Sequence, residues 1–204
     1  MPASAQRVVY GTHVVTALVR NQDGTPLSGK LVQFSGFGGV SSCQTDGFGA
    51  CSISYGGPAF PRTDVISGCV DSLCDTSQNQ WILPTSTLGS SDGSGQILPP
   101  GPSSVKVVDF EFSASGQLKG KCLIKDVNTG TTFRCVDIIA YVQSGPHTFF
   151  YGHGTANGVT QTYRMDVNDG GESRGAVDTF ALVTDLGYAL AGTVVKGNLQ
   201  VRGR

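Results

Sequence analysis

Residues 85–104 read TSTLGSSDGSGQILPPGPSS, and this stretch divides the chain into two halves. Asp92 is its only charged residue, it contains no aromatic residue, and it consists mostly of Gly, Ser, Thr and Pro. Such a composition buries too little apolar surface to offset the entropy that is lost on ordering. We therefore interpret residues 85–104 as a flexible Gly/Ser/Pro-rich linker between one domain over residues 1–84 and a second over residues 105–204.

The composition on both sides of this stretch predicts an all-β protein. The 204 residues include 29 Gly and 9 Pro, and only 14% are charged, which is typical of short strands joined by tight turns. No long segment has the i, i+3, i+4, i+7 apolar spacing of an amphipathic helix. The net charge of −1 gives no electrostatic reason to expect a nucleic-acid partner. No apolar run is long enough to span a bilayer, so we expect no membrane insertion.

The six cysteines form three couples that are close in sequence: Cys43 and Cys51, Cys69 and Cys74, and Cys122 and Cys135. The first and third couples enclose a Gly-containing turn, so their cysteines can face each other across a hairpin. The Cys and His spacings that are typical of zinc sites are absent. We predict one disulfide within each couple, although six cysteines allow about 15 pairings. Disulfides persist in oxidising compartments, so we expect a secreted, cell-surface or periplasmic protein.

Apolar segments in the first half predict the strands of an immunoglobulin-like β-sandwich. A hairpin is expected over residues 42–55, with Cys51, Ile53 and Tyr55 on one face. Further strands are expected at residues 8–10, 13–20, 31–34, 63–70 and 80–83.

Three motifs in this half carry a family resemblance. They are the Asp-Gly-x-Pro-x-x-Gly turn at 23–29, the Thr-Asp-x-x-Gly-Ala run at 45–50 and Asp-Val-Ile at 64–66. With them, residues 8–83 resemble the bacterial immunoglobulin-like domain of the invasin/intimin type. The resemblance implies a β-sandwich that serves as a spacer or adhesive module of surface and secreted proteins. The two cysteine couples of this half depart from the usual domain.

The second half predicts about eight strands at short spacing, as in an antiparallel sandwich or barrel. The clearest alternation is Val159, Gln161, Tyr163, Met165 and Val167 against polar neighbours. This half resembles the post-COAP domain, a C-terminal module of bacterial surface and secreted proteins. The residues that carry the likeness are Asp109-Phe110, residues 150–158 (FYGHGTANG), residues 169–172, residues 178–180, Gly187-Tyr188 and Gly197-Asn198. The function of that family is poorly defined, so the resemblance implies a fold and a setting but no reaction.

One acid-rich segment is a candidate calcium site. It contains Asp166, Asn168, Asp169, Glu172 and Asp178, and Ca²⁺ takes several carboxylate and carbonyl oxygens from flexible loops. It does not have the ligand spacing of an EF-hand. The alternative is a polar turn in which Asn and Asp bond their own backbone.

No catalytic set stands out in the sequence. His13, His147 and His153 suit structural roles, and no Ser or Cys lies in a nucleophile-elbow motif. We therefore expect no enzyme. The aromatic residues could line a sugar-binding face, but most lie on the apolar side of alternating strands, where core packing is the better account.

These observations favour a structural or adhesive segment of a bacterial cell-surface or secreted assembly, acting by self-association or docking to a protein partner. The alternative is a carbohydrate- or protein-binding accessory module, stabilised by calcium. Open sandwiches leave strand edges that can pair with another chain. We expect such edges at residues 7–10 and 198–202, both of which contain an arginine.

Overall fold

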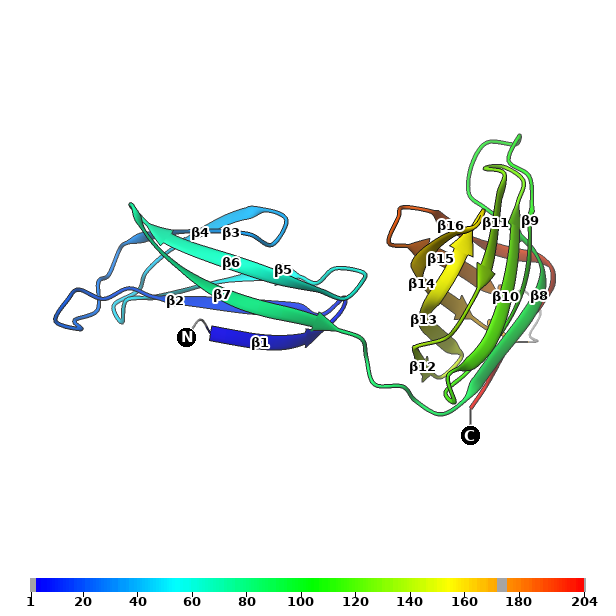
Figure 1. The fold of residues 1–204 in the computed structure, drawn as a ribbon, viewed down its shortest axis with the longest axis horizontal. Coiled ribbons are helices and arrows are strands. Elements are labelled where there is room, and N and C mark those ends of the chain that lie inside the picture. Colours follow the sequence, from blue (N-terminus) through cyan, green and yellow to red (C-terminus); the bar gives the residue numbers. More distant parts are fainter. Residues whose placement is uncertain (1–2, 172–175, 204) are drawn as a thin grey trace. The chain divides into compact units, whose positions relative to one another are not determined.

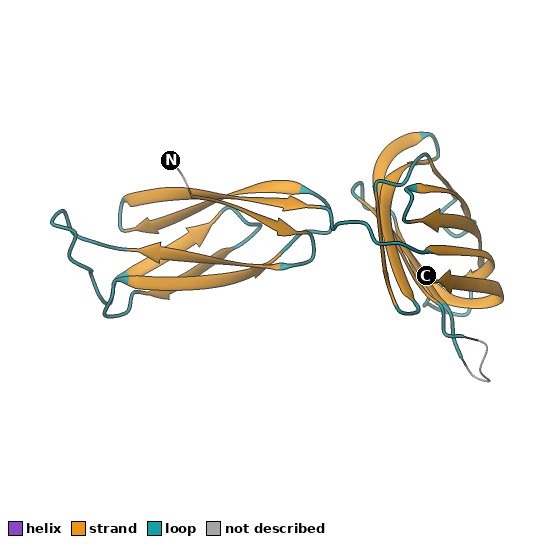
Figure 2. Ribbon diagram, turned by 90° about the horizontal axis from the view of Figure 1, so that it is seen from below, coloured by secondary structure: helices purple, strands orange, loops and turns teal. Residues whose placement is uncertain are grey.

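The computed structural model describes residues 3–171 and 176–203. Within these ranges all regular structure is β-strand (Figure 2), which confirms the predicted all-β class. Accordingly, the described residues include no helix of the length and apolarity needed to cross a membrane. The chain folds as two compact units, Met1–Leu83 and Pro84–Arg204.

The first unit is a β-sandwich of a five-stranded and a two-stranded sheet (Figure 1). The larger sheet has the order β1 (Ala3–Val8), β7 (Leu73–Ile82), β6 (Arg62–Val70), β3 (Leu31–Ser35) and β4 (Val40–Gln44). The smaller sheet pairs β2 (Thr12–Leu18) with β5 (Ala50–Gly56). Strands β7, β6 and β3 thus correspond to strands G, F and C of an immunoglobulin-like sandwich, and β2 and β5 to strands B and E.

The hairpin predicted over residues 42–55 does not form, because β4 pairs with β3 and β5 pairs with β2. The turn between them is closed by Asp46, whose Oδ1 accepts hydrogen bonds from the backbone nitrogens of Phe48 (2.8 Å) and Ala50 (2.9 Å). This turn carries the chain from one sheet to the other. The inward face predicted for β5 is nevertheless correct, since its residues at 51, 53 and 55 are all buried.

All three predicted disulfides are present. Cys43–Cys51 joins the two sheets of the sandwich, whereas Cys69–Cys74 joins directly opposed residues of the β6–β7 hairpin. Cys122–Cys135 links the strands β10 (Lys119–Asp126) and β11 (Thr131–Cys135). Three disulfides are characteristic of an oxidising compartment.

The second unit is an antiparallel barrel whose strands wrap around to close on themselves (Figure 1). Besides β10 and β11, the barrel contains β8 (Ser90–Leu98), β9 (Val108–Ser115), β13 (His147–Ala156), β14 (Val159–Asn168), β15 (Thr179–Thr184) and β16 (Ala189–Arg202). Strand β13 closes the barrel because it is long enough to have two partners on one side. Its residues 147–151 pair with β12 (Ala140–Ser144), and its residues 154–156 pair with β11.

The prediction of a linker over residues 85–104 is wrong, because residues 90–98 form β8, a strand of the barrel wall that pairs with β9 on one side and β16 on the other. Small residues in β8 allow β16 to pack closely against it. A Cβ on Gly93 would collide with Leu199, and one on Gly95 would collide with the backbone of Lys196. Ile97 is fully buried. Hydrogen bonds to the two neighbouring strands hold this segment in place. The local composition does not reveal those partners.

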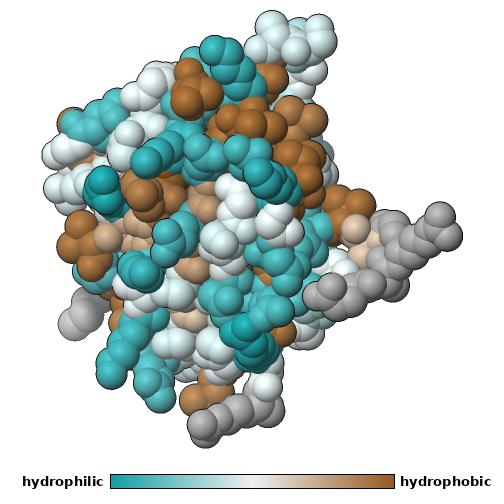
Figure 3. Space-filling model, turned by 90° about the vertical axis from the view of Figure 1, so that its right-hand side faces the viewer, coloured by the Kyte–Doolittle hydropathy of each residue, from teal (hydrophilic) through white to brown (hydrophobic). Residues whose placement is uncertain are grey.

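The barrel interior is aromatic, as the sequence predicted. Phe110, Phe112 and Phe180 contact one another with ring centroids 5.2–6.3 Å apart. The alternation along β14 is observed from Gln161 to Val167, whereas Val159 is exposed next to the β13–β14 turn. On the barrel face seen in Figure 3, hydrophobic side chains are interspersed with hydrophilic ones.

Candidate functional site

The acid-rich segment lies where β16 extends beyond the end of β15. β15 pairs with β16 only as far as Thr193, and β16 continues to Arg202. The carboxylate of Asp178 takes the place of the missing strand. Its Oδ2 accepts a hydrogen bond from the backbone nitrogen of Leu199 at 3.1 Å, and its Oδ1 accepts one from that of Gly170 at 2.9 Å.

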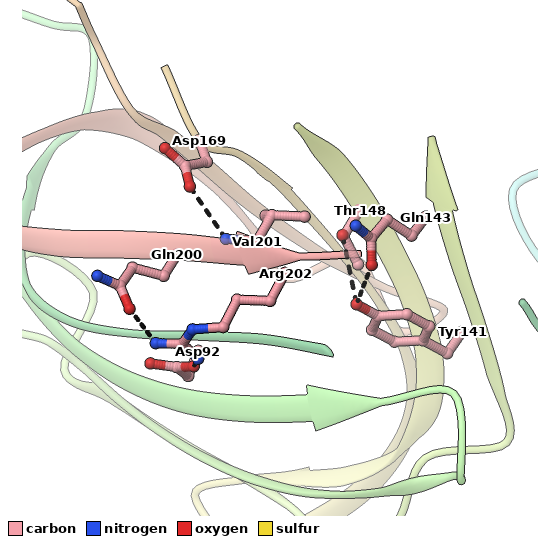
Figure 4. A network of polar contacts seen from close by, with 8 residues as sticks. All are labelled: Asp92, Tyr141, Gln143, Thr148, Asp169, Gln200, Val201 and Arg202. Carbon is pink, nitrogen blue, oxygen red and sulfur yellow. Dashed lines mark hydrogen bonds and ion pairs between the residues drawn. The ribbon is translucent and has the colours of Figure 1, made fainter. Parts of the chain in front are cut away.

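Asp169 performs the same task two residues further along β16 (Figure 4). Its Oδ2 accepts a hydrogen bond from the backbone nitrogen of Val201 at 3.0 Å, and its Oδ1 accepts one from that of Gly171 at 2.8 Å. Arg202, at the end of the same strand, pairs with Asp92 of β8. All four oxygens of the Asp169 and Asp178 carboxylates therefore have backbone donors.

Asp166 belongs to a separate group on the outer face of β14. The guanidinium of Arg164 donates two hydrogen bonds to its carboxylate, at 2.7 and 2.6 Å, and lies 4.5 Å above the ring of Phe149. Burial opposes the charge of Arg164, but the hydrogen bonds and negative charge of Asp166 outweigh it and raise the pKa of the guanidinium. His147 Nε2 lies 3.6 Å from Asp166 Oδ1.

The structure therefore distributes the predicted calcium ligands over two places. Asp166 faces Arg164, Asp169 and Asp178 face the backbone of β16, and Asn168 ends β14. Glu172 lies outside the described residues. Within residues 3–171 and 176–203, no group of three or more His, Cys, Asp or Glu side chains gathers as metal ligands would.

A groove of about 630 Å³ crosses the outer face of β14, β15 and β16. Its floor includes the small residues Ala181, Ala191 and Gly192, and His147 and Asp166 contribute to its lining. Phe180 is the one aromatic ring among its lining residues besides His147, and it is buried at 1% exposure. The groove thus presents no broad aromatic face on which a sugar could stack.

The histidines make structural contacts and are not paired with nucleophilic side chains. Both the ring Nδ1 and the backbone nitrogen of His153 hydrogen-bond the carboxylate of Asp137, at 2.9 and 2.7 Å. Although burial opposes it, these bonds lower the pKa of Asp137. His13 is buried at 7% exposure, with its ring edge-on to Tyr55. Within the described chain, no histidine hydrogen-bonds a Ser, Thr or Cys side chain.

A polar cluster that the sequence did not reveal lies between the sheets of the sandwich. Asp64 is buried and accepts hydrogen bonds from Trp81 Nε1 at 2.6 Å and Arg62 Nε at 2.8 Å. Asn79 lies opposite Asp64 in the β6–β7 register and is fully buried. Burial and the charge of Asp64 raise the pKa of Tyr55 to about 12. The sequence contains one signal of this cluster, because the polar Asp64 lies two positions before Ile66 and therefore on the same face of the strand.

One of the two predicted strand edges is open and the other is not. Residues 198–202 do not form an open edge, since they pair with β8 on one side and with the two aspartates on the other. The outer edge of β12 is also occupied, because Thr87 donates a backbone hydrogen bond to Tyr141 at 2.8 Å and its Oγ1 accepts one from Gln143. The predicted edge over residues 7–10 is confirmed for its first two residues, because they lie on the edge strand β1, whose one strand partner within the described residues is β7.

The most distinctive edge belongs to β2, whose partner in the described chain is β5 alone. Gly57 N donates to Gly11 O at 2.7 Å, and Val19 N donates to Gly49 O at 2.8 Å. These bonds identify the odd-numbered residues of β2 as those that bond β5. The backbone groups of residues 12, 14, 16 and 18 must then point away from β5, because bonded and non-bonded positions alternate in antiparallel pairs.

The side chains on this strand make its edge apolar. Val14 is 56% exposed and Leu18 is 64% exposed. The sequence of β2, THVVTAL, contains no Asp, Glu, Lys, Arg or Pro, which are the usual protections against edge pairing. An uncharged edge with unpaired backbone groups is chemically suited to receive another extended strand.

Comparisons with protein-family models, with curated proteins and with solved structures found no match. The likeness of the two halves to invasin/intimin-type and post-COAP domains accordingly remains an expectation from their motifs.

Proposed function

We propose that this protein is a non-enzymatic structural or adhesive segment of a bacterial cell-surface or secreted assembly, and that it docks to its partner through the open edge of β2. The observation that carries this proposal is the uncharged edge of residues 12–18 with its outward-facing backbone groups. An extended peptide backbone is the ligand whose donors and acceptors match such an edge.

Three further observations support this proposal. The three disulfides suit an oxidising compartment. The acids and histidines that were candidates for a functional site make structural contacts. Asp169 and Asp178 accept backbone hydrogen bonds from β16, and Asp137 hydrogen-bonds His153. The family resemblances of both halves imply the setting of surface and secreted proteins. The barrel groove does not favour the carbohydrate-binding alternative, because its lining lacks exposed aromatic faces.

The proposal is tested by locating the protein in its source cells. Labelling of intact cells with a membrane-impermeant reagent, together with analysis of the medium, should find the protein outside the cytoplasm with all six cysteines resistant to alkylation. Replacing Val14 and Thr16 with lysine should release it from the assembly with which it cofractionates. Ser54→Lys, on the outward face of the neighbouring strand β5, should leave it bound. A cytoplasmic protein with free thiols would contradict the proposal.

A further inference from the structure

The edges of the molecule differ in how well they are protected against pairing. In the barrel, the strands close on themselves and the edge of β12 is occupied by Thr87. In the sandwich, β1 carries Arg7, and β4 is a short, polar strand of sequence VSSCQ. The outer edge of β5 presents Ser52, Ser54 and Gly56. Strand β4 is also uncharged, with Val40 exposed, but it is five residues long, whereas β2 extends over seven uncharged residues and exposes two apolar side chains, Val14 and Leu18.

From this contrast we infer that the partner of β2 is β2 of a second copy of this chain. The inference rests on the proposed function, because it names the partner of the same edge. Two copies related by a two-fold axis present the same surface to each other, so the edge must be complementary to itself. The following register meets that condition.

An antiparallel pair centred on Val15 places Thr12 opposite Leu18 of the second copy, and Val14 opposite its Thr16. In this register all the outward-facing residues of β2, namely 12, 14, 16 and 18, fall at hydrogen-bonded positions. Moving the register by two residues in either direction leaves one of them without a partner. The centred register is therefore the one that uses the whole edge.

Side-chain chemistry favours the same register. Val14 and Leu18 are exposed on the outward face, and each meets a threonine of the second copy, so pairing covers their apolar surface. Pairs of β-branched residues are favourable across antiparallel strands. No like charges are brought together, because β2 has none. The product is a continuous four-stranded sheet in the order β5, β2, β2 and β5.

The first test requires no substitution. Sedimentation and light scattering of the full chain, from about 1 µM to about 1 mM, should show a reversible monomer–dimer equilibrium. Over the same range, amide hydrogen exchange at Val14, Thr16 and Leu18 should slow as the dimer forms, since their N–H groups become bonded. A protein that stays monomeric to the highest concentration, with these amides unprotected, overturns the inference.

The second test addresses the register. Val14→Lys combined with Thr16→Lys places lysines opposite each other twice across the two-fold axis, and should weaken dimerisation at least about tenfold. Val14→Lys combined with Thr16→Glu places Lys opposite Glu in both pairs and should restore dimerisation to near the original strength. Ser54→Lys, one strand away from the axis, should have little effect. Trp81 fluorescence during urea unfolding verifies that each variant is folded.

Each outcome of these tests is decisive. A dimer that the double-lysine variant does not weaken forms through another surface, and overturns the inference, as does failure of the Lys/Glu variant to recover. If a lysine variant does not fold, the concentration-dependent protection of the unmodified chain decides the question. A monomer that still requires the β2 edge for attachment to the cell surface would contradict the second copy as partner and leave the proposed function standing.

Discussion

Asp178 accepts a hydrogen bond from the backbone nitrogen of Leu199 at 3.1 Å, at a point where β16 has extended beyond the end of β15. The contact joins residues that lie 21 positions apart in the chain. A carboxylate thus substitutes for the neighbouring strand that would otherwise bond this backbone. Acids that resemble a cation site in the sequence are, in the folded barrel, part of the sheet.

The first prediction concerns this contact. Asp178→Asn replaces one acceptor oxygen with a donor, so the backbone nitrogen of either Gly170 or Leu199 loses its acceptor. We expect the free energy of unfolding of the barrel to fall by about 1–3 kcal/mol in urea titrations. Glu111→Gln is the control, because its contact with Lys121 is exposed and exposed pairs contribute about 0–1 kcal/mol. Equal stability of the two variants would contradict the prediction.

The second prediction concerns calcium. All four carboxylate oxygens of Asp169 and Asp178 already accept backbone hydrogen bonds, and Asp166 is paired with Arg164, so a cation would compete with these interactions. We therefore expect the full chain to have the same melting temperature in saturating calcium and in chelator. A ligand that binds only the native state must raise that temperature. A clear rise with calcium would contradict this prediction and show that the native protein binds the cation.

The third prediction is a pH dependence that originates in the sandwich. Burial lowers the pKa of His13, Arg7 adds to this effect and Asp64 opposes it. The unfolded chain therefore binds a proton more readily than the folded one, and stability decreases as the pH falls below about 6.5. His13 is the single histidine of residues 1–83, and Trp81, the single tryptophan, is buried in the same unit.

Trp81 fluorescence should consequently report a lower unfolding free energy for the sandwich at pH 5 than at pH 7.5. His13→Phe keeps a ring beside Tyr55 but cannot titrate, so the difference between the two pH values should become smaller. An unchanged difference in this variant would assign the dependence to other groups.

The fourth prediction compares two disulfides by loop length. Cys122–Cys135 closes a separation of 13 residues, and Cys69–Cys74 closes one of 5. In the chain-entropy model, replacing both cysteines with alanine should destabilise the barrel by about 3 kcal/mol in the first case and the sandwich by about 2 kcal/mol in the second. Denaturant unfolding of each unit measures both losses. The reverse order would indicate that native-state packing, rather than loop closure, determines the effect.

The fifth prediction tests the boundary between the units. A fragment of residues 84–204 contains β8 and should fold, whereas a fragment of residues 105–204 lacks the strand between β9 and β16 and should not form the barrel. Dispersed amide resonances and near-ultraviolet circular dichroism distinguish the two outcomes. A folded 105–204 fragment would show that β8 is dispensable.

The sequence predicted those features that depend on neighbouring residues. Alternation identified the buried face of β14 from Gln161 to Val167, because side chains on a strand point to opposite faces in turn. The three disulfides followed from cysteines that are close in the chain. The cysteines of β10 and β11 face each other across a turn that the local sequence itself specifies.

The tertiary structure decided the features that depend on distant partners. Residues 90–98 look like a linker by composition, yet they form β8 because Gly93 and Gly95 allow β16 to approach closely and supply hydrogen bonds. The β4–β5 turn has hairpin chemistry, but each strand pairs with a different sheet. Likewise, the sequence alone shows only that Asp178 is an acid. The folded barrel makes Asp178 a structural hydrogen-bond acceptor, because the backbone nitrogen of Leu199 has no neighbouring strand to bond on that side. Local sequence sets which way side chains point, whereas backbone hydrogen bonding between strands is a property of the whole sheet.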